Sequence, residues 1–226
     1  MRQVLQSRAP VLEYVQYGCG LSAPDGWLNF DVSPRLRAER VPVLAPCLRV
    51  AGKVLYPMNV RYGDIVAGLP LEDASVCGAY ASHVLEHMDR QSIEVALRNT
   101  FRMLRPQGTF RLVVPDLIWR ASELLRGASV GEPDAADRFM CSSYLGEREP
   151  NKTLVARLRS VLGNSAHRWM YDYAGMARLL EQAGFVSIRR CRFGDADDAM
   201  FDLVEDEGRF YESGHEELAI EAKRPA

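Results

Sequence analysis

The clearest pattern in the chain is a helical repeat over residues 90–104. Its apolar positions recur every three or four residues, as on the buried face of an amphipathic helix: Ile93, Leu97, Phe101 and Leu104. Pro106 and Gly108 follow and predict its end. Two further helices have a predicted N-cap and a glycine stop, one from Asp116 to Gly127 and one from Asp172 to Gly184.

Seven short apolar or alternating segments predict strands: 12–17, 27–32, 59–66, 76–82, 109–114, 186–193 and 217–223. Strands and helices alternate along most of the chain, which is typical of a parallel sheet. The last two strands follow each other without a helix and predict an antiparallel hairpin. We therefore expect an α/β fold with a Rossmann-like, mostly parallel seven-stranded sheet, a C-terminal antiparallel hairpin and helices on both faces.

The connections carry further predictions. Only residues 21–27 join the first two strands, too few for a full crossover helix, so that helix is expected to be reduced or missing. Four prolines within 33–57 allow only a short helix there. Residues 128–170 interrupt the rhythm and predict an insertion or lid with a helix near 154–162. The acidic stretch 195–207 is expected to be a solvated loop.

Length and composition fit one domain over residues 1–226. The 226 residues are 47% hydrophobic and 26% charged, as in globular proteins. A net charge of −2 indicates neither a nucleic-acid partner nor an anionic membrane. No stretch approaches the roughly 20 apolar residues of a membrane span, and residues 1–10 lack an apolar signal core, so a cytoplasmic location is expected. Five scattered cysteines without a CxxC pair indicate reduced thiols.

Glycines and carboxylates stand at three successive strand ends. The segment Tyr17, Gly18, Cys19 and Gly20 ends the first strand, and glycines there let a backbone approach a ligand closely. Asp31 ends the second strand, where a carboxylate can accept both hydroxyls of a ribose.

Asp64 ends the third predicted strand and could accept from an adenine amino group while Ile65 packs on the base. Each feature alone is also explained by a turn or a helix cap. Together they predict one crevice for an adenosine-containing ligand.

The order of these segments resembles the class I methyltransferases over nearly the whole chain. The matching phrases are YGCG (17–20), GWLNFD (26–31), LPLEDAS (69–75), ASHVLEHM (81–88), RMLRPQGT (102–109), VVPDL (113–117), HRWMYDY (167–173) and LEQAGF (180–185). The resemblance implies S-adenosylmethionine as the cofactor. It places Gly18 and Gly20 at the methionine end, Asp31 at the ribose, Asp64 at the adenine, and Ser82 and His83 beside the sulfonium.

The sequence departs from the family pattern in four places, of which the largest is the short path between the first two strands. Gln16 replaces the acidic residue usually found two positions before the first glycine, Ser22 replaces the third glycine, and Gln107 stands where a glycine is common. A nicotinamide-dependent oxidoreductase fits less well, because it needs a longer glycine motif that runs into a helix. A non-catalytic cofactor-binding or scaffolding protein with the same fold stays open as an alternative.

Histidines supply the candidate catalytic groups. A hydroxyl acceptor usually needs a general base, for which His83 and His167 are the candidates; each could instead be a hydrogen-bonded structural residue. His87 is expected to pack or cap. His83 and His87 share a helical spacing, but the sequence shows no convincing third ligand, so no metal is predicted. The aromatic and basic residues around His167 suit a polar acceptor, for which we expect a small-molecule or glycan hydroxyl. The sequence does not indicate an oligomeric state.

Overall fold

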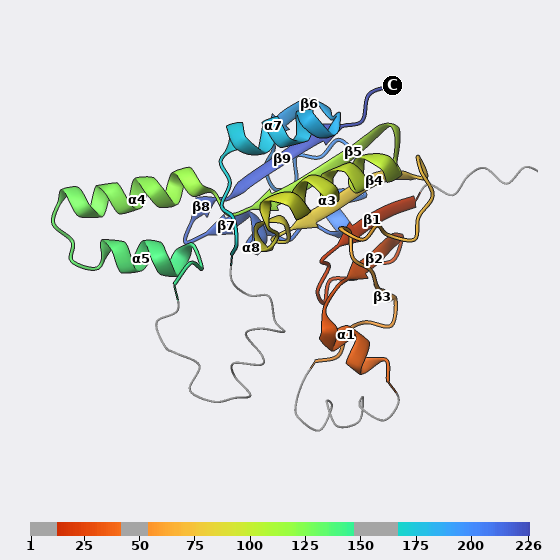
Figure 1. The fold of residues 1–226 in the computed structure, drawn as a ribbon, viewed down its shortest axis with the longest axis horizontal. Coiled ribbons are helices and arrows are strands. Elements are labelled where there is room, and N and C mark those ends of the chain that lie inside the picture. Colours follow the sequence, from red (N-terminus) through yellow and green to blue (C-terminus); the bar gives the residue numbers. More distant parts are fainter. Residues whose placement is uncertain (1–12, 42–53, 147–166) are drawn as a thin grey trace, which may run out of the picture.

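A seven-stranded sheet organises the chain in the computed structural model, which describes residues 13–41, 54–146 and 167–226 (Figure 1). The strand order is β3-β2-β1-β4-β5-β9-β6. The strands are β1 Glu13–Tyr17, β2 Trp27–Asp31, β3 Val60–Tyr62, β4 Val76–Ser82, β5 Leu104–Val114, β6 Val186–Arg190 and β9 Leu218–Lys223. The first five pair in parallel, whereas β9 runs antiparallel between β5 and β6. The predicted Rossmann-like sheet with a reversed C-terminal strand is confirmed.

The register brings the candidate site residues to one edge. Tyr17 on β1 pairs with Phe30 on β2, and Gln16 on β1 pairs with Tyr80 on β4. Parallel neighbours in this register end side by side, so the glycine loop, Asp31 and Ser82 all lie at the carboxyl edge of the sheet.

Two helices cover one face of the sheet. They are α3 Arg90–Met103 and α7 Tyr173–Ala183, and their apolar stripes pack with the inward residues of the strands in one core. Asp89 caps α3 through its side chain, and Asp172 caps α7 as the sequence predicted. Gly184 ends α7 with a left-handed φ of 102°, which a residue with a Cβ adopts only under strain.

The first crossover helix is missing, as predicted. Within residues 18–26 the chain makes only turns before β2 begins. Gln16 and Asn29, buried side by side on the strands, hold this connection: Gln16 donates to the Ser22 carbonyl and Asn29 to the Pro24 carbonyl. The short path is thus tied down by polar groups on the strands rather than by a helix packed on them.

The prediction of a solvated loop over 195–207 is wrong. The short helices η2 Phe201–Leu203 and α8 Glu207–Phe210 lie in and after this stretch, and Phe201, Val204 and Phe210 are buried. They pack against Tyr14 and Trp27 on the sheet face that the missing helix leaves bare. Two of its acidic residues, Asp195 and Glu205, pair with Arg111, a buried arginine on β5.

Several element boundaries differ from prediction. The third strand is shorter than 59–66, β6 ends at Arg190 rather than 193, and β5 begins at Leu104 rather than 109. Helix α4, Leu117–Ser129, is capped by Asp116 as expected but continues past Gly127. A short helix, α1 Pro34–Glu39, occupies the proline-rich stretch.

The predicted insertion begins as a helical hairpin. Helix α5, Ala135–Ser142, packs along α4, and the pair extends away from the sheet (Figure 1). A small ribbon of β7 Tyr211–Glu212 and β8 His215–Glu216 precedes β9. The helix predicted near 154–162 lies outside the described residues. Among those residues, no helix is long and apolar enough to cross a membrane.

Candidate functional site

The glycine loop after β1 has a conformation that requires its glycines. Gly18 and Gly20 have left-handed φ values of 65° and 56°. A Cβ on Gly18 would lie 2.3 Å from Cγ2 of Val84, while a Cβ on Gly20 would meet nothing within 4 Å. The loop is therefore packed tightly against the turn after β4 at its first glycine and is open at its second.

Asp31 holds the glycine loop in place. It is 8% exposed, and one carboxylate oxygen accepts from the Gly20 amide at 2.9 Å while the other accepts from the Ser33 amide at 2.7 Å. Each carboxylate oxygen has a second lone pair, so these bonds leave acceptor capacity for a ligand hydroxyl.

The other residues predicted near the adenosine differ in exposure: Asp64 is half-buried, whereas Ile65 and Tyr17 are buried. Asp64 does not end β3 but lies in the following turn, where its carboxylate accepts from the Val66 amide at 2.8 Å. Ile65 is 4% exposed and packs in the main core. Tyr17 is also buried, with its hydroxyl 3.0 Å from that of Thr100. Tyr17 and Ile65 could therefore meet a ligand mainly through their backbone.

A cavity of about 410 Å³ lies over the glycine loop. Its lining includes residues 16–22, Tyr80 and Ser82 from β4, and Asp206 and Arg209 from the segment that replaces the first helix. Within the described residues, the buried Tyr80 hydroxyl and Ser82 hydroxyl have no hydrogen-bond partner. Unpartnered buried polar atoms at a cavity wall are what a polar ligand can satisfy, so the cavity fits the polar end of a cofactor.

A second cavity of about 430 Å³ adjoins the first. It is lined by His83, Glu86, His87, Pro115, Arg120, Tyr144, His167, Gly208, Arg209, Tyr211, Glu212 and Glu217. Arg209 lines both cavities, and the consecutive residues Ser82 and His83 belong to the first and the second. The end of β4 therefore stands where the two cavities meet.

His83 connects the turn after β4 to α8. It has a left-handed φ of 53°, its Nε2 lies 2.9 Å from the Arg209 carbonyl oxygen, and its Nδ1 lies 3.3 Å from Oε1 of Glu86. Burial lowers the pKa of His83, but the Glu86 carboxylate and the Arg209 carbonyl raise it more, so the net shift is upward. Both ring nitrogens of His83 therefore contact protein atoms, which is typical of a histidine that positions its neighbours.

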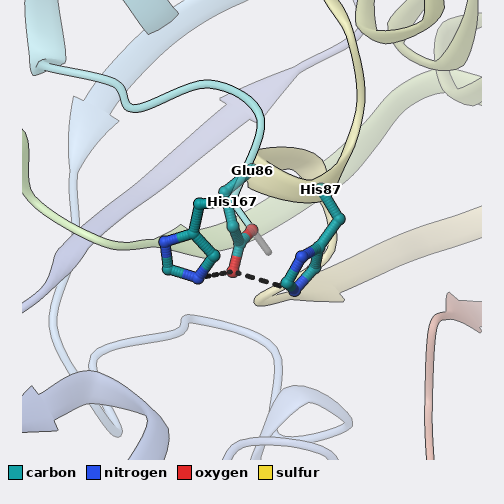
Figure 2. A group of neighbouring side chains, drawn as sticks. All are labelled: Glu86, His87 and His167. Atoms are coloured by element: carbon teal, nitrogen blue, oxygen red, sulfur yellow. Dashed lines mark ion pairs between the residues drawn. The ribbon is translucent and has the colours of Figure 1, made fainter. Parts of the chain in front are cut away.

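His167 meets Glu86, which the sequence did not single out, and His87, which was expected to pack or cap. The Glu86 carboxylate is fully buried, and Nε2 of His87 and Nε2 of His167 approach its Oε1 at 3.9 and 4.0 Å (Figure 2). Burial lowers the pKa of His167 below its ordinary value, against the effect of Glu86. The sequence signal for the Glu86 cluster was the position of Glu86 itself, a charged residue beside the apolar pair Val84 and Leu85. Arg209 lies just after the stretch that was expected to be solvated, and no sequence signal singled it out.

One wall of the second cavity is an ion-pair network. Arg120 on α4 is buried and donates to both oxygens of Glu217 at 2.9 and 2.8 Å, and it also pairs with Glu212. The Asp116 amide donates to Glu217 as well. This network ties α4 to the strands at the end of the chain and keeps the cavity wall polar.

The comparisons with known proteins agree with this architecture. Residues 16–112 match the family model of a methyltransferase domain. No curated protein matches the sequence. A SAM-dependent methyltransferase from Archaeoglobus fulgidus is similar in structure, with 14% identity over 94% of this chain and 86% of that one and a TM-score of 0.51.

A second solved structure, a SAM-dependent methyltransferase from Methanosarcina mazei, has 13% identity over 94% of this chain and 92% of that one, with a TM-score of 0.49. At such identities the structural likeness concerns the fold.

Proposed function

We propose that this chain is a class I S-adenosylmethionine-dependent methyltransferase that methylates a hydroxyl of a small molecule or a glycan. The observation that carries the proposal is the pair of adjoining cavities that meet at Ser82 and His83. A donor in the glycine-loop cavity and an acceptor in the histidine-lined cavity would face each other at the end of β4. Methyl transfer needs this alignment above all, because the reaction is an in-line displacement.

The donor cavity and the strand ends beside it offer groups suited to the cofactor; Gly18, Gly20 and Ser82 line the cavity, and the predicted adenosine contacts Asp31, Asp64 and Ile65 lie outside that lining. The backbone at Gly18 and Gly20 would contact the methionine end, and the Ser82 hydroxyl would supply a hydrogen bond nearby. Asp31 would accept from the ribose with its remaining lone pairs. Asp64 and Ile65 would lie toward the adenine. When bound, S-adenosylmethionine supplies a methyl group activated by the positive sulfur.

The acceptor cavity favours a polar molecule. Its volume of about 430 Å³ is in the range of small-ligand sites. Carboxylates, guanidinium groups and imidazoles dominate its lining, and such groups recognise hydroxyls by hydrogen bonds. His83 would position the acceptor, and His167 would hold the acceptor hydroxyl while its proton leaves the oxygen that attacks.

Calorimetric titration tests the cofactor assignment. We expect the protein to bind S-adenosylmethionine and not NAD, and we expect Asp31→Ala to weaken that binding strongly. Gly131→Ala, a glycine change at an open surface turn far from the loop, is a matched control that should leave it unchanged. Unchanged affinity in Asp31→Ala would remove Asp31 from the cofactor site.

Release of S-adenosylhomocysteine in a screen of sugars, polyols and phenols tests the acceptor class. We expect His167→Ala to reduce turnover and to spare cofactor affinity, while His215→Ala, a histidine outside the cavity lining, should retain both. Loss of cofactor affinity along with turnover would make His167 structural. Turnover with amines and none with hydroxyl compounds would refute the hydroxyl assignment.

A further inference from the structure

Glu86, His87 and His167 form a cluster whose ligand atoms lie within 4.8 Å of one another (Figure 2). We infer that this cluster is a binding site for a divalent transition-metal ion, set in the wall of the acceptor cavity. The three side chains come from two separate parts of the chain, the turn η1 Leu85–His87 and the loop before α7. Their convergence is therefore a product of the tertiary fold.

The state of the Glu86 carboxylate is the first argument. Glu86 is 0% exposed, and within the described residues neither oxygen accepts a well-formed hydrogen bond. Nδ1 of His83 approaches one carboxylate oxygen, Oε1, at an ion-pair distance of 3.3 Å. The other oxygen, Oε2, has no hydrogen-bond partner within the described residues. A buried carboxylate left in this state is costly, and a bound cation would satisfy it.

The spacing of the ligand atoms is the second argument. Two ligands that share one zinc-like ion at about 2.0–2.2 Å from it lie about 3.0–3.5 Å apart. Nε2 of His87 and Nε2 of His167 lie 3.9 and 4.0 Å from Oε1 of Glu86. The widest separation in the cluster is up to 4.8 Å, so side-chain rotations must bring the three ligand atoms closer by roughly 0.5–1.5 Å before they share one ion.

Backbone hydrogen bonds and ring packing hold the turn η1 and the loop before α7 together, independently of the ligand atoms. The Arg168 and Trp169 amides both donate to the Glu86 carbonyl, at 2.8 and 3.1 Å. The rings of His87 and His167 meet edge to face with centroids 5.1 Å apart, and the Tyr144 ring packs on His167 at 4.8 Å. A site held in this way is preorganised, because metal binding need not bring distant segments together.

The donor set selects the kind of metal. Two imidazoles and one carboxylate are typical of Zn²⁺, Fe²⁺, Mn²⁺ and Co²⁺ rather than Ca²⁺ or Mg²⁺, which prefer oxygen ligands. The cavity lining carries three carboxylates, those of Glu86, Glu212 and Glu217, and two guanidinium groups, those of Arg120 and Arg209. Three protein ligands leave coordination positions that can open to the cavity.

The role of the ion rests on the proposed function. A hydroxyl bound to the ion at an open position becomes more acidic. Its proton leaves to water in the cavity. The oxygen lone pair then forms the new O–C bond as the S–C bond of the donor breaks and leaves its electrons on sulfur. His167 then serves the acceptor through the ion.

Titration of the untagged, chelator-treated chain with Co²⁺ tests the site, because bound Co²⁺ absorbs visible light with an intensity that reports its coordination. We expect one Co²⁺ per chain, displaced by Zn²⁺. Since loss of a residue that merely supports a ligand costs 10–100-fold in affinity, His87→Ala and His167→Ala should each weaken binding by at least about 100-fold. His215→Ala, which removes the histidine stacked on Trp119, should bind as the unmodified chain does.

Circular dichroism would confirm that each variant is folded. Glu86→Gln, which keeps the shape of the side chain, provides a second test if an alanine variant unfolds, and it should also lose Co²⁺. Absence of Co²⁺ binding in the folded chain, or binding retained in the folded His87→Ala/His167→Ala variant, would overturn the site. The titration needs no cofactor or acceptor, so a metal-binding chain that methylates no hydroxyl would refute the proposed acceptor and leave the site standing.

Discussion

The contact between Gly18 and Val84 yields a prediction whose size can be worked out. Gly18→Ala places a Cβ at 2.3 Å from Cγ2 and 3.1 Å from Cγ1 of Val84. A left-handed backbone costs a residue with a Cβ about 1–2 kcal/mol. Overpacking costs about 1–3 kcal/mol more. The free energy of unfolding should fall by about 2–5 kcal/mol in total.

Gly20→Ala is the matched control, because the backbone is also left-handed there but the space around the new Cβ is open. It should lower the free energy of unfolding by only about 1–2 kcal/mol. The variant Gly18→Ala/Val84→Ala removes the two closest contacts and leaves only Cβ of residue 84, at 3.3 Å. We therefore expect the two changes together to cost about 1–3 kcal/mol less than the sum of their separate costs.

Urea unfolding followed by tryptophan fluorescence measures these differences, and calorimetry with S-adenosylmethionine measures the effect on the loop. Equal losses of stability in Gly18→Ala and Gly20→Ala would refute the argument, as would strict additivity of Gly18→Ala and Val84→Ala. Either result would mean that the loop is free to move away from the turn after β4.

Three further predictions concern the segment that covers the second sheet face and the glycine loop. Phe201→Ala should lower the free energy of unfolding by about 3–5 kcal/mol, whereas Leu203→Ala, at a half-exposed position, should change it by less than about 0.5 kcal/mol in the same denaturation assay. Arg111→Met leaves the buried Glu205 carboxylate without its partner and should cost about 3–5 kcal/mol; recovery of part of that loss in Arg111→Met/Glu205→Gln checks the reason. Burial, reinforced by the nearby Asp31 carboxylate, raises the pKa of Cys19 to about 12, so at pH 8 iodoacetamide should modify this thiol only after unfolding; mass spectrometry showing equal rates in the native and unfolded protein would contradict this.

The elements with local signals were predicted well. Helix α3 was visible from its apolar repeat, and α7 from Asp172 at its start and Gly184 at its end. The missing first helix followed from the few residues between β1 and β2. These features depend on residues close together in sequence, whose capping, spacing and backbone preferences act within one element.

The covered second face shows where local signals fail. The acidic residues of 195–207 indicated a solvated loop because charged side chains usually face water. Two of these residues, Asp195 and Glu205, pair with Arg111, which lies 84 and 94 positions before them in the sequence. Only the assembled sheet shows that the missing helix leaves aromatic surface there for Phe201 to cover.

The candidate site likewise has features that the sequence predicted and features that only the packed structure shows. The sequence by itself determined that the glycine loop, Asp31 and the residues after β4 lie at one edge, because parallel strands end together. Three features come only from the packed structure: Glu86 is fully buried beside His83, His167 reaches it from 81 positions along the chain, and Arg209 lines both cavities. The physical reason is that burial and encounters between distant residues depend on how the elements pack, and no local pattern in the chain specifies that packing.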